Sequence, residues 1–172
     1  MITKKELVVP AFYITYINKV TEDNITDALN NNTRQFNALL QTITPQQEDY
    51  AYAQGKWTIK EMLQHIIDAE RVFSLRAVWF ARQDPSAQPG FDENTWAVHA
   101  PVHHRSWQTM IAEFNALRTA TTLLFGSFSD EQLLLTGTAN NNVISVATLG
   151  YVCAGHVEHH MGVLRERYGC EL

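Results

Sequence analysis

The stretch from Ser145 to Tyr168 constrains the fold of this chain more than any other segment. Its apolar residues recur at steps of three and four, which is the period of a helix with one buried face. Ser145 can cap the first turn, and Gly169 can end the helix in a left-handed conformation. His156 and His160 share the buried face one turn apart, so both imidazoles can reach the same point in space. Helices use this spacing to offer two nitrogen ligands to one metal ion, and a third ligand must then come from elsewhere.

Three further segments carry a helical pattern. They are Thr21–Thr42, Thr58 to about Ala81–Gln83, and Ser106 to about Gly126. The second begins with a capping box, because Thr58 is followed three residues later by Glu61. No segment alternates convincingly as a strand, and residues 137–142 are interpreted as a turn-rich loop. Four long amphipathic helices predict an all-α four-helix bundle.

The connections suggest how the bundle is completed. We expect one domain over residues 1–172, with residues 1–20 forming an extended or partly helical arm that packs on the bundle. The connection 84–105, between the second and third long helices, contains three prolines and has no sustained period. Long connections of this kind often form lids or binding loops. Its length also permits a topology other than simple up-down-up-down.

Charge and composition exclude several classes of protein. The net charge is −5 and the lysines and arginines are scattered, which argues against nucleic acid as a partner. No segment approaches the roughly 18–20 apolar residues needed to cross a membrane. Glu6 and Pro10 interrupt any apolar region near the start, so we predict no signal peptide. Two cysteines form no disulfide framework, which fits a reducing compartment and a cytoplasmic protein.

His65 is the candidate for the third ligand. It lies beside Met62 and Ala69 on the apolar side of the second long helix, where a buried imidazole needs a partner. If this helix packs against the last one, His65, His156 and His160 can meet. Three imidazoles with an open position are typical of catalytic metal sites, and imidazole suits Zn²⁺ or Ni²⁺. The alternative is that each histidine is a core residue bonded to a neighbouring carbonyl or carboxylate.

Other histidines are weaker candidates. His159 is a rival to His160, but it points about 100° away around the helix, and we expect it to face solvent or a partner subunit. A second pair spaced by four residues, His99 and His103, is interrupted by Pro101, which excludes a regular helix there. We therefore do not expect that pair to bind a metal ion, and we assign His103 and His104 to a solvated loop.

Charged residues follow His65 on the same helix. Asp68 lies one turn from His65 and could orient a ligand imidazole as a hydrogen-bond acceptor. Glu70 and Arg71 could form an ion-pair network with residues of the last helix such as Glu158 or Arg165, although we interpret them as solvated surface charges, which is the usual position for such side chains.

Three stretches of the chain resemble the DinB-like family of the DinB/YfiT superfamily. They are GKWTIKEMLQHIIDAERVFSLRAVWFARQD, PGFDENTW and AGHVEHHMGVLRERY. The resemblance implies a four-helix bundle that holds a metal ion through His65, His156 and His160. It also implies either S-transfer with a low-molecular-weight thiol, such as bacillithiol or mycothiol, or metal-dependent hydrolysis. Members of this family often form homodimers.

Two hypotheses of function follow. In the first, the protein is an enzyme whose metal ion lowers the pKa of a water or thiol, and the nucleophile attacks a small-molecule substrate in a pocket roofed by residues 84–105. Asp92 and Glu93 could then act as a base or an extra ligand, although a role in structuring the loop is simpler. In the second, the protein is a non-catalytic metal-binding, stress-response or interaction protein. An open coordination position beside a concave pocket distinguishes the enzyme.

Overall fold

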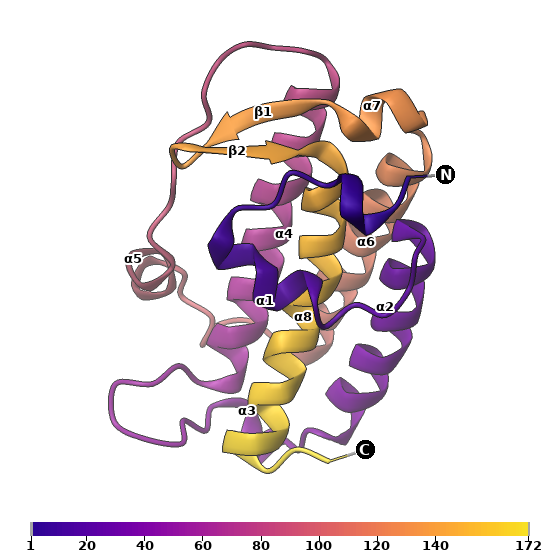
Figure 1. The fold of residues 1–172 in the computed structure, drawn as a ribbon. Coiled ribbons are helices and arrows are strands. Elements are labelled where there is room, and N and C mark those ends of the chain that lie inside the picture. The colour runs from indigo at the N-terminus through magenta and orange to yellow at the C-terminus, as the bar shows by residue number, and fades with distance from the viewer. Residues whose placement is uncertain (1, 172) are drawn as a thin grey trace.

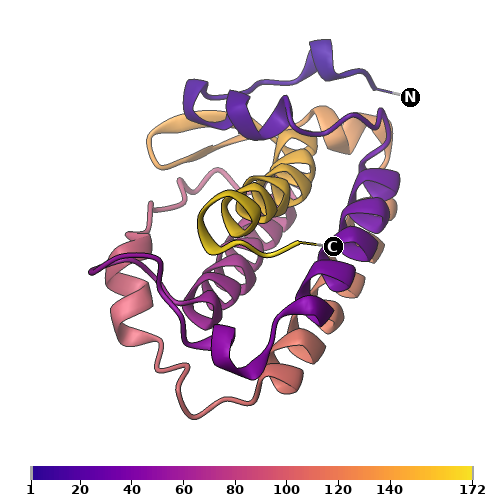
Figure 2. The ribbon, with the colours of Figure 1, turned by 90° about the horizontal axis from the view of Figure 1, so that it is seen from below.

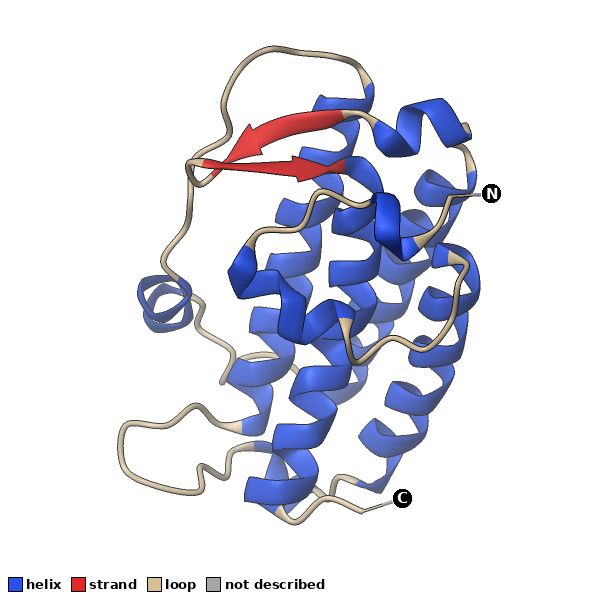
Figure 3. Ribbon diagram, viewed as in Figure 1, coloured by secondary structure: helices blue, strands red, loops and turns tan. Residues whose placement is uncertain are grey.

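Four long helices form the body of the protein. A computed structural model describes residues 2–171, so Met1 and Leu172, the ends of the predicted domain, lie outside the described residues. The long helices are α2 (Ile25–Thr42), α4 (Ile59–Ala81), α6 (Trp107–Gly126) and α8 (Val146–Tyr168). Figures 1 and 3 show them packed side by side, with one small sheet at the end near the N-terminus. The prediction of a four-helix bundle is confirmed.

The ends of these helices follow local signals. The backbone N–H of Glu61 donates to Thr58 Oγ1 at 3.2 Å, and the Glu61 carboxylate accepts from the Thr58 N–H at 2.7 Å, which completes the capping box. Ser106 and Ser145 cap α6 and α8, and Gly169 ends α8 with a φ of 67°. In α2 the cap is Asn24 rather than Thr21, so this helix begins later than predicted.

The bundle does not have simple up-down-up-down topology. The broad helix contacts are those of α2 with α6, α6 with α4, α4 with α8, and α8 with α2. The consecutive helices α2 and α4 therefore lie across the diagonal of the bundle, as the view from below shows (Figure 2). The neighbours α4 and α6 run in the same direction (Figure 1). The chain must consequently travel the length of the bundle between them.

The connection 84–105 makes this return along the face of α4. A parallel helix of 23 residues is about 34 Å long, which explains why the connection is long. The first part is fixed to the sheet, because the Gln88 N–H donates to the Thr138 carbonyl at 2.8 Å and the Asn140 N–H donates to the Gln88 carbonyl at 3.0 Å. Further along, the connection forms α5 (Glu93–His99), which packs on α4. The connection is thus a covering wall rather than a structureless loop.

A β-hairpin replaces the loop that was predicted at residues 137–142. After the short helix α7 (Asp130–Leu134), strands β1 (Thr136–Ala139) and β2 (Asn142–Ser145) pair antiparallel. The turn residues Asn140 and Asn141 have φ values of 47° and 60°. Two consecutive residues with positive φ are the geometry of a tight type I′ turn, which asparagine tolerates. The prediction that this part of the chain forms no strands was therefore wrong.

The N-terminal residues lie across the upper half of α8 (Figure 1). They form two single 3₁₀ turns, η1 (Lys4–Glu6) and η2 (Ala11–Tyr13), and the short helix α1 (Ile14–Ile17). A further short helix, α3 (Pro45–Glu48), follows α2. α1 packs closely on α8 because Gly155 has no side chain: a Cβ there would lie 2.2 Å from the Tyr16 carbonyl oxygen. This close approach places Tyr16 directly over the histidine face of α8.

A polar layer crosses the middle of the bundle between two apolar clusters of buried residues. Its centre is Arg118 of α6, which is 1% exposed and bonds to both carboxylate oxygens of Glu70 on α4. Arg118 also donates to Asn32 of α2 and to the Cys153 carbonyl of α8. One guanidinium therefore joins all four long helices. Glu70 is buried, so its interpretation as a surface charge was wrong.

None of the helices in the described part of the chain combines the length and apolar character required to cross a membrane.

Candidate metal centre

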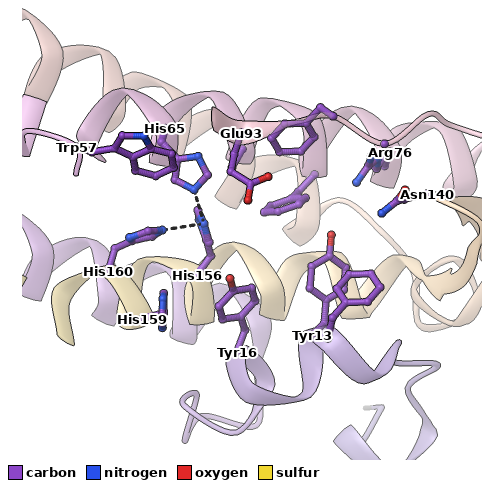
Figure 4. A pocket seen from close by; sticks show the side chains of 15 residues that line it. Tyr13, Tyr16, Trp57, His65, Arg76, Glu93, Asn140, His156, His159 and His160 are labelled. Carbon is purple, nitrogen blue, oxygen red and sulfur yellow. Dashed lines mark hydrogen bonds between the residues drawn. The ribbon is translucent and has the colours of Figure 1, made fainter. Parts of the chain in front are cut away.

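Three histidines meet in the polar layer, between α4 and α8. The Nε2 atom of His156 lies 3.0 Å from Nε2 of His65 and 3.1 Å from Nε2 of His160 (Figure 4). α8 places His156 and His160 one turn apart on its inner face, and α4 brings His65 to them from the opposite side. Ligand atoms of the three side chains all lie within 4.8 Å of one another. The structure thus brings together the trio that the helical periodicity selected.

Burial keeps these imidazoles neutral. His156 is 4% exposed and His160 is 8% exposed. Burial lowers the pKa of His65 from its usual 6.5 to about 4. Burial, followed by the neighbouring imidazoles of His160 and His65, holds the pKa of His156 well below its usual value, and burial does the same for His160. At neutral pH each ring therefore has one nitrogen lone pair available to a metal ion.

The arrangement of the three nitrogen atoms fits a metal ion better than it fits hydrogen bonding. A neutral imidazole nitrogen is either a donor or an acceptor, so His156 Nε2 cannot make two full hydrogen bonds to the other rings. A divalent ion accepts all three lone pairs. Nitrogen ligands about 2.0–2.1 Å from an ion lie roughly 3.0–3.4 Å from their neighbours, which agrees with the two short separations. The residues present therefore fit the group that their pattern predicts.

The surroundings of the trio differ from the usual pattern of metal-bound histidines. Nδ1 of His160 is buried and has no hydrogen-bond partner among residues 2–171, although such nitrogens usually donate to a carbonyl or carboxylate. Asp68 does not fill this role. Its carboxylate accepts from Gln64 at 3.0 Å and pairs with Arg71 at 3.4 Å, away from the imidazoles.

The remaining histidines lie outside the trio. His159 is half-buried beside Tyr16, with ring centroids 5.4 Å apart, and lines the same cavity, so its side chain is only partly exposed to solvent. His99 bonds to the Thr95 carbonyl at the exposed end of α5, and His103 contacts His104 edge to face. α5 ends at His99, and Pro101 lies between His99 and His103, so no regular helix joins the two histidines, as expected.

A cavity of about 410 Å³ opens beside the three histidines. One face of α4 forms a wall of it, because His65, Ala69, Phe73 and Arg76 follow one another at steps of four, four and three. The N-terminal arm supplies Tyr13 and Tyr16, and the connection 84–105 supplies Gly90, Phe91 and Glu93. Because α8 adds its histidines and the hairpin turn adds Asn140, the cavity is assembled from at least five separate parts of the chain. Its volume suits a small organic molecule.

The two acidic candidates of the connection have different positions. Asp92 caps α5 by accepting from the Thr95 N–H at 2.8 Å, and this bond lowers the pKa of Asp92. Glu93 lines the cavity, and its negative charge acts on His65 and Tyr16. Figure 4 shows the Glu93 carboxylate directed into the cavity near His156. Of the pair, only Glu93 is placed to act on a molecule in the cavity.

Arg76, Tyr16 and Asn140 were missed by the sequence reasoning. A signal for Arg76 was present, because it continues the apolar stripe of Ala69 and Phe73 as a charged residue on a buried face. No such signal marked Tyr16 or Asn140. They reach the cavity only through the packing of the arm and of the hairpin turn.

Comparisons with known proteins agree with this geometry. A family model described as the DinB superfamily matches residues 28–164, a range that contains all three histidines. A protein of Oceanobacillus iheyensis named "putative metal-dependent hydrolase" is 25% identical over 151 residues, which are 86% of this chain and 87% of that protein. A protein of Geobacillus thermodenitrificans with the same name is 26% identical over 132 residues, 74% of each chain.

The fold also resembles a solved structure. YfiT from Bacillus subtilis, described as a probable metal-dependent hydrolase with an unusual four-helix bundle topology, superposes with a TM-score of 0.73. The match covers 95% of this chain and 94% of that one, at 19% sequence identity. At this identity the likeness establishes the fold.

Proposed function

The protein belongs to the DinB superfamily, and from this membership and the geometry of its histidines we propose that it is a metal-dependent hydrolase of a small molecule. His65, His156 and His160 would hold the divalent ion, Zn²⁺ or Ni²⁺. The observation that carries the proposal is the convergence of three Nε2 atoms at the wall of a cavity. The names of the two bacterial relatives support the same reaction class.

The metal ion and the side chains would divide the chemistry between them. A divalent ion with three imidazole ligands and an open position supplies a nucleophile near neutral pH by lowering the pKa of water. Glu93, directed into the cavity near His156, accepts the proton from that nucleophile and returns it to the leaving group. Tyr16 stays protonated, because burial raises its pKa, and its hydroxyl can donate to the developing negative charge.

Metal content and hydrolysis together test this proposal. Untagged wild-type protein is expected to bind one divalent ion, and His156→Ala is expected to lose it. His159→Ala is the matched control, since His159 lines the same cavity but its nitrogens are not part of the trio. Glu93→Gln should keep the metal and lose most of the hydrolysis of ester and amide substrates. If no ion binds even after reloading, the histidines are a packing cluster and the proposal is wrong.

Thiol-dependent S-transfer is the second candidate, and one observation favours it. A second cavity of about 230 Å³ lies beyond Trp57 and His160, which line both cavities. The nucleophile of an S-transferase needs its own binding space, and this cavity offers a position for a low-molecular-weight thiol. Adding bacillithiol or mycothiol to metal-loaded protein with an electrophilic acceptor tests the alternative. Product formation that requires the thiol would favour transfer over hydrolysis.

We propose in addition that the protein is cytoplasmic, which its two unpaired cysteines support, and that it forms a homodimer, as the family resemblance implies. Sedimentation of the purified protein tests the second point.

A further inference from the structure

The cavity beside the histidines has two chemically different ends. The three imidazoles and Glu93 lie at one end, and Arg76 and Asn140 lie at the other (Figure 4). Aromatic side chains form the walls between them, contributed by Phe12, Tyr13, Tyr16, Phe73 and Phe91. Arg76 follows His65 by eleven positions on α4, which is about 16 Å along the helix axis. A molecule that fills this cavity meets a polar group at each end and an apolar wall in between.

Arg76 is a buried cation without an acidic partner. It is 4% exposed, and its Nη2 donates to the Pro89 carbonyl at 2.6 Å. The guanidinium also interacts with the Tyr13 hydroxyl. Burial raises the pKa of Tyr13 to about 12, so this phenol is neutral at physiological pH. Within residues 2–171, no carboxylate forms an ion pair with Arg76.

A second buried arginine, Arg118, has the counterion that Arg76 lacks. Arg118 is 1% exposed, and both oxygens of Glu70 meet its charge. A buried charge without a counterion carries a large desolvation cost, so buried arginines are normally paired. Arg76 departs from this rule at the wall of a cavity. An anion in the cavity is the partner that its position lacks.

Asn140 adds a second polar side chain at the same end. The hairpin turn and the connection hold it there, because its backbone N–H bonds to Gln88 and its side chain packs against Gly90. A Cβ on Gly90 would lie 2.5 Å from Asn140 Oδ1, so the side-chain position depends on the glycine. An amide beside a guanidinium supplies additional N–H donors for an oxyanion.

We propose that Arg76 and Asn140 form an anion subsite, and that the substrate carries a carboxylate or phosphate joined through an apolar segment to the bond that reacts at the histidines. This inference rests on the proposed function for the location of the reacting bond. The subsite itself depends only on Arg76, Asn140 and the aromatic walls. It selects anionic aromatic or aliphatic compounds over neutral ones of the same shape.

The first test compares isosteric probes on the wild-type protein. 3-Phenylpropanoate, 2-phenylethylphosphonate, which carries a phosphate-like group on the same spacer, and the neutral 3-phenylpropanamide are titrated calorimetrically into metal-loaded and chelator-treated protein. Because a charge-assisted hydrogen bond is replaced by a neutral one, an anionic probe should bind roughly 10- to 100-fold more tightly than the amide. The preference should persist after chelation, which separates Arg76 from anion binding by the metal. The tighter of the two anions identifies the group. Equal affinity for all three probes would overturn the proposal.

Arg76→Gln then assigns the preference to one side chain. The variant should bind the anionic probes as weakly as the amide, and Arg82→Gln, which removes an exposed charge near the end of the same helix, should bind as wild type does. Arg76→Gln with unchanged anion affinity would also overturn the proposal. Should this variant not fold, the comparison of probes on the wild-type protein still decides. Metal content, measured in parallel, reports on the proposed function separately, because a protein that binds no metal can still prefer the anion.

Discussion

Removing the charge of Glu70 should destabilise the protein more than any surface substitution. Glu70 is 2% exposed and bonds to Arg118 through both carboxylate oxygens, at distances of 2.7–3.0 Å. Glu70→Gln keeps the shape and one acceptor oxygen but leaves the Arg118 charge buried without a counterion. Breaking one partner of such a pair costs about 3–5 kcal/mol. In a domain of this size, that is a fall in Tm of roughly 6–20 °C.

A matched surface pair provides the control. Glu113 pairs with both Arg71 and Arg105, and these three side chains are 25%, 47% and 26% exposed. Glu113→Gln should therefore cost less than about 1 kcal/mol, because exposed pairs are well solvated and contribute little. Both variants are compared with wild type by urea denaturation. If the dependence of the unfolding free energy on urea concentration is the same for all three proteins, the shift in midpoint gives the change in stability.

The double variant Glu70→Met with Arg118→Met separates two explanations. If the cost of Glu70→Gln comes from the unpaired charge, removing both charges should recover most of the lost stability. If the pair itself supplied the stability, the double variant would be at least as unstable as the single one. A loss below about 1 kcal/mol for Glu70→Gln would refute the reasoning, since it would mean that water or another group solvates Arg118.

Three further predictions concern the site and its supports. The folded-state pKa of His65, about 4, lies below its usual 6.5, so protonation favours the unfolded chain; as the pH falls from 6.5 to 4, metal-free protein should lose about 3 kcal/mol of unfolding free energy through His65, and more in total because the pKa values of His156 and His160 are lowered as well, measured by denaturation at each pH. Gly155→Ala should cost roughly 1–3 kcal/mol and expose the α1 amides to hydrogen exchange, because the new Cβ meets Tyr16. Gly162→Ala, in the same helix with nothing within 4 Å, should instead stabilise by about 0.5–1 kcal/mol, and a melting temperature that responds alike to both substitutions would contradict this account. Chelation should remove about 2.7 kcal/mol from wild-type protein that had been kept at 100 times its metal Kd, and nothing from His156→Ala, as read by thermal unfolding.

At the hairpin and at the anion subsite, the sequence contains a relevant pattern, but each pattern is compatible with two different structures. Asn140 and Asn141 form the two-residue turn between short strands, a pattern that also fits an ordinary loop when the strands have four residues each. Arg76 continues the buried stripe of α4, yet a single charge at the end of a stripe is equally consistent with a side chain that reaches solvent. Contacts with residues 84–105 decide both structures, because Asn140 bonds to Gln88 and Arg76 bonds to Pro89.

The sequence by itself determined the four long helices, most of their ends, and the spacing that lets His65, His156 and His160 meet. These features depend on residues within a turn or two of one another, so periodicity and capping reveal them. Only the tertiary structure decided the order of the helices, the return of residues 84–105 along α4, and the cavity with Arg76 at its far end. Those features arise from contacts between residues far apart in the chain. The free energy gained from such contacts depends on which surfaces pack together, and local sequence patterns do not indicate which surfaces these are.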